Sequence, residues 1–140
     1  MRDAAAFAVL HGQSFHRGWS DGEFEGLLAE RNVIAQRALR RGKLTGFILS
    51  RLAAGEAEIL SIAVAASDRN RGLGRRLLDL HLRRLAGTGC RTVFLEVDEN
   101  NEPARKLYRR AGFHEVGRRE GYYRQGETAT AALVLRREIL

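Results

Sequence analysis

The sequence predicts one domain with a mixed α/β layer fold. Apolar residues recur first with helical spacing and then with strand-like spacing, in the order two helices, three strands, a helix, a strand, a helix and two strands. With 44% hydrophobic residues and one proline in 140 residues, the composition is that of a globular chain that buries a sizeable core. No repeat, low-complexity segment or linker divides it, so we expect a single domain over residues 1–140.

Two helices are predicted at the N-terminal end. The first covers residues 4–14, and the second begins at an N-cap near Asp21 and carries apolar residues such as Phe24 and Leu28 at helical spacing. Trp19, the only tryptophan, lies just before this cap. It is either a core anchor for the helix pair or one wall of a substrate groove, and the sequence leaves both interpretations open.

Three strands joined by two turns follow. From residue 32 the apolar spacing becomes strand-like, and it predicts strands over residues 33–39, 44–52 and 56–65. Glycine-containing segments at residues 40–43 and 53–55 predict the turns between them. This part therefore reads as a meander of neighbouring antiparallel strands.

A leucine-rich helix is predicted over residues 73–86, with a wide apolar face suited to lying on a sheet. The next strand, residues 91–97, is apolar throughout its centre, and we expect burial on both of its faces. The segment at residues 100–103 predicts the start of another helix, because an asparagine can cap it and a proline fits its first turn. Two last strands are predicted over residues 113–117 and 128–136.

The run Arg69-Asn70-Arg71-Gly72-Leu73-Gly74 lies between the third strand and the leucine-rich helix. The first N–H groups of a helix lack intrahelical partners and carry partial positive charge, so a glycine-containing loop before a helix predicts an anion site. The pattern alone is weak, and it is neither a Walker loop nor a dinucleotide-binding fingerprint. The strand before this loop, the amphipathic helix after it and the nearby arginines strengthen the prediction of a polyphosphate-binding site.

Glu96 interrupts the apolar strand over residues 91–97. A buried carboxylate is costly unless it is paired, so Glu96 is either a core ion pair with an arginine or a general base. Tyr108 follows on the next helix, where a phenol near a phosphate cradle can act as a general acid. Alone, Tyr108 would be interpreted as a core aromatic.

Charge and cysteine content restrict the remaining possibilities. The net charge of +7 favours an anionic partner, although a solvated basic surface explains it equally well. Cys90 is the only cysteine, and His11, His16, His81 and His114 lack metal-binding spacing, so we expect structural or surface roles for them and no metal site. We find neither a signal peptide nor a membrane-spanning run, and we expect a cytoplasmic protein.

Several motifs together resemble the GCN5-related N-acetyltransferases, and among these the bacterial ribosomal-protein-alanine N-acetyltransferases of the RimI type. The motifs are Ile62-Ala63-Val64, Arg69-x-x-Gly72-x-Gly74, Leu95-Glu96-Val97, Asn101-x-x-Ala104-x-x-Leu107-Tyr108-x-x-x-Gly112-Phe113 and the stretch from Arg118 to Tyr123. The resemblance covers about residues 3 to 137. It implies a mostly antiparallel central sheet with helices on both faces. Because Met1 leads almost directly into helix, either the family's first strand is missing from this sequence or the sheet starts one strand short.

The resemblance implies acetyl-CoA as the cofactor and a protein N-terminal α-amine as the acceptor, in particular the N-terminal alanine of a ribosomal protein. Glu96 would be the general base and Tyr108 the general acid. The implied cofactor-binding residues are Ile62, Ala63, Val64, Arg69, Asn70, Arg71, Gly72, Leu73, Gly74, Arg75 and Asn101. Trp19, Tyr122 and Tyr123 would line the acceptor slot, although a structural role explains these aromatics equally well. We expect a monomer that acts at neither membranes nor nucleic acids.

One departure from the family pattern concerns the acceptor. The loop His16-Arg17-Gly18-Trp19 lacks the proline that the family often has before this tryptophan, which bears on the preference for the N-terminal residue. Two alternatives to this function also stay open: the same fold acetylating a small amine such as a polyamine or an antibiotic, and a non-catalytic basic module that binds nucleic acid. The second lacks a recognition-helix pattern or a basic strand with interleaved aromatics.

Overall fold

The computed structural model describes residues 21–65, 72–125 and 128–139. The predicted helix over residues 4–14, Trp19 and Arg69 to Arg71 lie outside these residues, as does any strand that would precede them. The described elements are α2 (Asp21–Ala29), β1 (Val33–Arg40), β2 (Lys43–Ala53), β3 (Glu56–Val64), α3 (Leu73–Gly87), β4 (Thr92–Asp98), α4 (Glu102–Arg110), β5 (His114–Gln125) and β6 (Thr128–Glu138).

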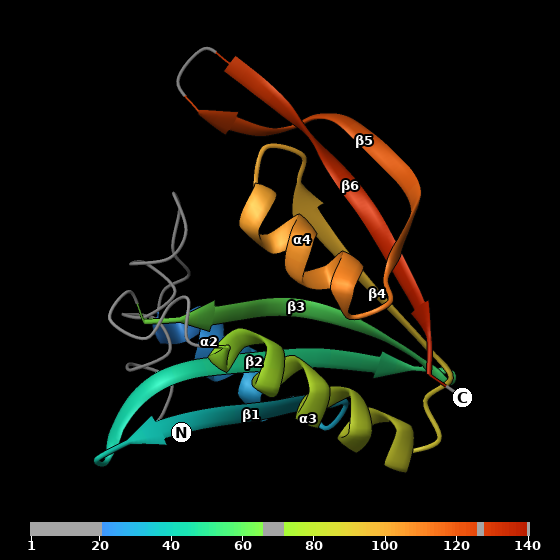
Figure 1. Cartoon of the computed structure of the whole chain (residues 1–140). Coiled ribbons are helices and arrows are strands. Elements are labelled where there is room, and N and C mark those ends of the chain that lie inside the picture. Colours follow the sequence, from blue (N-terminus) through green and yellow to red (C-terminus); the bar gives the residue numbers. More distant parts are fainter. Residues whose placement is uncertain (1–20, 66–71, 126–127, 140) are drawn as a thin grey trace.

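The described strands form one six-stranded sheet in the order β1-β2-β3-β4-β6-β5. Every neighbouring pair is antiparallel except β3 and β4, which are parallel because α3 connects them. Helices α3 and α4 cover one face of the sheet, and α2 lies behind the other (Figure 1). This arrangement confirms the predicted mixed α/β fold with a mostly antiparallel sheet.

Two apolar clusters correspond to the two faces. The larger lies under α3 and α4 and includes Leu78 and Leu85 from α3, Val93 and Leu95 from β4, and Tyr108 from α4. The smaller lies under α2. There, Phe24 meets Phe47 of β2 edge to face, with ring centroids 5.4 Å apart, and Leu49 and Ala63 pack beside them.

The predicted turns at residues 40–43 and 53–55 are confirmed as two-residue hairpin connections. Arg41 and Gly42 both have positive φ, of 53° and 79°, and so do Ala54 and Gly55, of 51° and 82°. Two successive residues with positive φ are characteristic of the type I′ turn, whose twist matches that of the flanking strands. Glycine takes the second position of each turn without a steric penalty.

Beneath α3, a buried polar network ties the helix to two strands. The imidazole of His81 is fully buried, with Nε2 2.7 Å from Ser50 Oγ on β2 and Nδ1 2.8 Å from Gln36 Oε1 on β1. Burial, with a smaller contribution from Arg84, lowers the pKa of His81 to about 4. The ring is therefore neutral at physiological pH: Nδ1–H donates to the glutamine oxygen, and Nε2 accepts the serine hydroxyl. The expected structural role of His81 is thus observed.

Two predictions about the strands are wrong. Strand β4 is not buried on both faces: Val93, Leu95 and Val97 are buried, whereas Phe94, Glu96 and Asp98 on the opposite face are partly exposed. The physical reason is that the cluster under α2 gathers residues of β1, β2 and β3, whereas β4 contributes only to the larger cluster.

The second correction concerns the end of the chain. Residues 119–125, predicted as part of a link, belong to β5, which runs from His114 to Gln125. Charged side chains at residues 118–120 and Gly121, with φ of 64°, hide the strand pattern, and irregularities in register interrupt its pairing with β6.

Among the helices in the described ranges, none is long and apolar enough to cross a bilayer.

Candidate functional site

The strands β3 and β4 pair only over a short distance and then separate. Their parallel ladder joins residues 56–59 to residues 92–95 and ends at the pair Ile59 and Leu95. Beyond it, residues 61–64 of β3 continue to pair with β2, and residues 96–98 of β4 continue to pair with β6. The two strands visibly diverge in Figure 1. The predicted site segments, Ile62 to Val64 and Glu96, all lie past the end of the ladder.

The N-terminus of α3 lies beside the end of β3, where Gly74 approaches Val64. Gly72 is the N-cap residue with φ of 76°, in the left-handed region that favours glycine, and no side chain of the described residues caps the helix there. The first turn also contains no acidic residue. Its N–H groups, on Leu73, Gly74 and Arg75, therefore remain suited to an anion.

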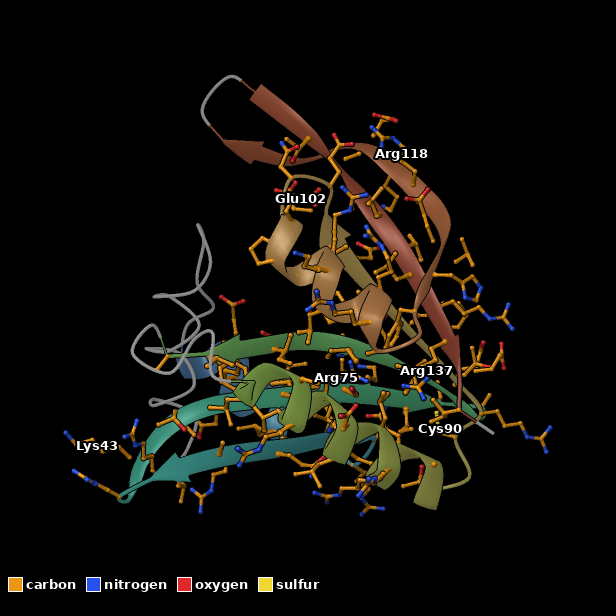
Figure 2. The ribbon with its side chains drawn as sticks, in the orientation of Figure 1. Lys43, Arg75, Cys90, Glu102, Arg118 and Arg137 are labelled. Atoms are coloured by element: carbon orange, nitrogen blue, oxygen red, sulfur yellow. The ribbon has the colours of Figure 1, made fainter. Side chains whose placement is uncertain are left out.

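Glycine at position 74 leaves room beside this turn. A Cβ there would lie 3.6 Å from Leu107 and 3.8 Å from Val64, which is ordinary contact, so the helix start does not depend on glycine for space. The guanidinium of Arg75 is engaged one turn along α3, where Nε lies 3.0 Å from Oδ1 of Asp79. Figure 2 shows Arg75 on α3 and Glu102 at the beginning of α4.

Asn101 caps α4, as predicted for this segment: its Oδ1 accepts a hydrogen bond from the N–H of Ala104 at 3.2 Å. Glu99 fixes the preceding loop. It accepts the N–H of Ala131 at 3.1 Å and pairs with Arg118 at 2.7 Å. The Ala131 hydrogen bond, the Arg118 hydrogen bond and nearby arginines lower the pKa of Glu99. The amide of Asn101 is exposed, so it can serve the helix with its oxygen and still offer its NH₂ group to a ligand.

Glu96 lies on the face of β4 that α3 and α4 do not cover. Its side chain is 25% exposed, and Arg119 of β5 donates to its Oε1 at 2.9 Å. An ion pair with an arginine, one of the two interpretations offered by the sequence, is therefore present. The carboxylate remains accessible, because the pair lies at the surface and not in the core.

Tyr108 lies on the opposite side of β4. Its side chain is 6% exposed, belongs to the cluster under α3 and α4, and meets Phe113 edge to face with centroids 5.9 Å apart. The structure thus brings Glu96 and Tyr108 to the same strand from opposite faces.

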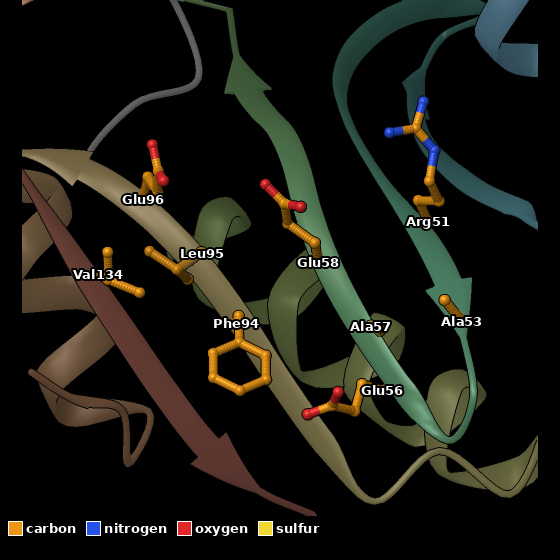
Figure 3. Close-up of a pocket in the computed structure, with 9 residues that line it drawn as sticks. All are labelled: Arg51, Ala53, Glu56, Ala57, Glu58, Phe94, Leu95, Glu96 and Val134. Carbon is orange, nitrogen blue, oxygen red and sulfur yellow. The ribbon is translucent and has the colours of Figure 1, made fainter. Parts of the chain in front are cut away.

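A cavity of about 330 Å³ lies on the Glu96 face, over the paired part of β3 and β4. Carboxylates of Glu56, Glu58 and Glu96 line it, and Phe94 forms an apolar part of its wall (Figure 3). Glu56, Glu58 and Arg119 are not among the site residues predicted from the sequence. The alternation Glu56-Ala57-Glu58-Ile59 was a usable signal, because it places both glutamates on one face of a strand.

The side chains of the aromatic residues predicted to line the acceptor slot are not among those that the structure describes. Trp19 lies outside the described residues. Tyr122 and Tyr123 belong to β5, but only their main chain is described, with Tyr123 paired to Thr130 of β6.

Comparisons with known proteins are consistent with this geometry. A family model described as "Acetyltransferase (GNAT) family" matches residues 5–113. The N-alpha-acetyltransferase RimI of Mycobacterium tuberculosis is 37% identical over 128 residues, which cover 87% of this chain and 79% of that protein. The crystal structure of the ribosomal-protein-S18-alanine N-acetyltransferase from Escherichia coli matches with a TM-score of 0.93 and 27% identity, covering 99% of this chain and 89% of that one. The crystal structure of Arabidopsis thaliana NAA60 in complex with acetyl-CoA shares the fold, with a TM-score of 0.88 at 20% identity.

Proposed function

Because the chain belongs to the acetyltransferase (GNAT) family and is an N-acetyltransferase, we propose that it moves an acetyl group from acetyl-CoA to a protein N-terminal α-amine. The acceptor we propose is the N-terminal alanine of a ribosomal protein. The observation that carries this choice is the match to the Escherichia coli ribosomal-protein-S18-alanine N-acetyltransferase over 99% of this chain.

The geometry supports acetyl-CoA binding at the point where β3 and β4 separate. The uncapped turn at Leu73 to Arg75 offers N–H groups to the pyrophosphate, and Arg69 to Arg71 lead into that turn. The main chain of Ile62 to Val64 offers hydrogen bonds to the pantetheine arm, which would lie beside β3 like an added strand. Asn101 would hydrogen-bond the same arm through its NH₂ group.

The acceptor would approach from the face that carries Glu96. Glu96 takes a proton from the ammonium, directly or through water, and the freed amine attacks the thioester carbonyl. An N–C bond would form and the C–S bond break, while Tyr108 would donate a proton to the departing thiolate and regain one from the attacking nitrogen, which must lose its second proton to become the amide. An α-amine has a pKa of about 7.7–8.0, so a modest base suffices and positioning supplies much of the rate.

The test replaces the proposed base. Glu96→Gln keeps the shape of the side chain but cannot accept the proton, so kcat for an alanine-starting peptide should fall roughly 10²- to 10⁴-fold. Affinity for acetyl-CoA, measured by calorimetry, should remain close to that of the wild type. Glu115→Gln, at an exposed position of β5, serves as the control and should keep full activity. If turnover is unchanged in Glu96→Gln, Glu96 is not the general base and has only a structural role in its ion pair with Arg119.

A second candidate is acetylation of a polyamine. The cavity beside Glu96 carries three carboxylates, and such a lining suits an acceptor with several ammonium groups. Comparing kcat/KM for an alanine-starting peptide with kcat/KM for spermidine separates the two functions. Activity on spermidine, with none on any peptide N-terminus, would exclude the first candidate.

A further inference from the structure

Glu96 is held by an arginine from a strand that is not its neighbour in the sheet. The guanidinium of Arg119, on β5, donates from Nη1 to Oε1 of Glu96 at 2.9 Å. In the strand order β4-β6-β5, β6 lies between the two residues. The proposed reaction assigns a role to Glu96 and none to Arg119, although the two side chains are in direct contact.

The pairing of the strands places both side chains on one face of the sheet. Glu96 is paired with Val134 of β6, and Arg119 is paired with Ala132, two residues along the same strand. Directly opposed residues share a face, and so do residues two apart along a strand, so Arg119 lies on the face that carries Glu96. Ala132 places only a methyl group on this face between β4 and β5, so the long arginine side chain can cross β6 there.

An irregularity in β5 begins directly after Arg119. The pair of Arg119 with Ala132 is followed by the pair of Tyr123 with Thr130, so β5 advances by four residues while β6 advances by two. Within this interval Gly121 has a φ of 64°, in the left-handed region that favours glycine. Such bulges re-aim side chains and are over-represented beside active sites. The local shape of β5 is therefore suited to directing Arg119 across β6.

The contact fixes one oxygen of the carboxylate. The side chain of Glu96 is 25% exposed, and it shares its cavity with the carboxylates of Glu56 and Glu58. Like charges repel, and a glutamate on an open face has several rotamers, so an unanchored carboxylate would change its direction. With Oε1 held by the guanidinium, the carboxylate keeps one orientation, in which Oε2 can accept a proton.

We propose that Arg119 is a positioning residue, which anchors the carboxylate of Glu96 for proton transfer from the acceptor amine. A general base must lie within hydrogen-bond reach of the proton that it takes, so the rate depends on where its oxygen is held. This inference rests on the proposed function, because it takes Glu96 as the base. Arg119 acts only through Glu96, and this property makes the inference testable.

The test measures kcat for an alanine-starting peptide in four proteins: the wild type, Arg119→Gln, Glu96→Gln and the double variant. Arg119→Gln alone should lower kcat roughly 10-fold, the effect of one hydrogen bond between charged groups. In the Glu96→Gln background the same substitution should change kcat by less than about 2-fold, because the anchored carboxylate is gone. The KM for acetyl-CoA should be the same in all four proteins.

Two further variants separate positioning from a structural role. Arg119→Lys keeps a cation that can donate to the carboxylate, so its kcat should stay within about 3-fold of the wild type. The matched control, Arg136→Gln, removes an arginine on the same face of β6 that has its own carboxylate partner, Glu138, and should keep full activity. Melting temperatures should stay close to that of the wild type throughout, because exposed ion pairs contribute little to stability.

The outcomes distinguish the inference from the proposed function. A loss of kcat in Arg119→Gln that appears only when Glu96 is present supports the inference. If the wild type acetylates the peptide and Arg119→Gln keeps its kcat, or loses the same factor in both backgrounds, the inference is wrong and the proposed function stands. A wild type that acetylates no peptide, or a Glu96→Gln variant with unchanged kcat, overturns the proposed function or its base, and the inference with it.

Discussion

The buried histidine under α3 should make the protein lose stability in mildly acidic solution. In the unfolded chain a histidine titrates near pH 6.5, whereas burial lowers the pKa of His81 to about 4 in the folded chain. Between these values the unfolded state binds more protons than the folded state, so the free energy of unfolding falls as pH falls. The contribution is fully present above pH 6.5 and is lost progressively down to pH 4.

The magnitude follows from the two pKa values. A difference of about 2.5 units corresponds to roughly 3 kcal/mol when the loss is complete, and to about 2 kcal/mol between pH 7 and pH 5. Between pH 7 and pH 5 the change in stability comes mainly from His81 and only slightly from the carboxyl groups. Hydrogen bonds to Glu99 and Glu138 lower the pKa of these carboxyl groups from the ordinary value of 4.5, so their contributions are lost only below that pH.

Urea unfolding at pH 7 and pH 5 measures the effect. The wild type should lose about 2 kcal/mol more than His81→Gln over this interval, because glutamine does not titrate. His114→Gln, at an exposed position on β5, should behave like the wild type. If His81→Gln and the wild type lose the same amount between pH 7 and pH 5, the assignment of a neutral, buried imidazole held by Ser50 and Gln36 is wrong.

Two further predictions concern Asn101 and Ala54. Asn101→Asp keeps an oxygen that can cap α4 but removes the NH₂ group, so urea unfolding should change by less than about 0.5 kcal/mol while the Kd for acetyl-CoA rises several-fold; Asn101→Ala should also lose about 1 kcal/mol of stability. An unchanged Kd in both variants would limit Asn101 to capping. Ala54→Gly should raise the free energy of unfolding by about 0.5–1 kcal/mol in thermal melts, because Ala54 adopts a φ of 51° in a type I′ turn. A loss of stability would contradict that reasoning.

The elements that the sequence predicts well have local causes. Paired positive φ values at Arg41-Gly42 and Ala54-Gly55 need only a turn of two residues, and the cap of α4 needs only Asn101 and the N–H three residues later. The helix α3 carries its own apolar face and ends at Gly87, one residue beyond its predicted end. Each of these features depends on residues that are close in sequence.

The features that the sequence does not predict depend on distant neighbours. Strand β4 is buried on one face only because α2 packs over β1, β2 and β3. The residues of β4 give no information about where α2 packs. The register between β2 and β3 shifts at Leu49 and Ser50, so simple alternation along β3 does not give the face of Ser61. The partner of Glu96, Arg119, comes from a strand hidden by charged residues and by Gly121.

The short parallel ladder between β3 and β4 also divides the molecule into two folding units. One unit is the meander β1, β2 and β3, whose strands are joined by two-residue turns, and the other is the sequence β4, α4, β5 and β6, in which β6 pairs with both β4 and β5. The seam between them joins residues 56–59 to residues 92–95, which are far apart along the chain, and long-range pairing of this kind tends to form late. A cofactor lying in the opening would touch both units. Part of the binding free energy of the cofactor would then stabilise the pairing of β3 with β4. The free energy of unfolding would therefore be higher with the cofactor bound than without it.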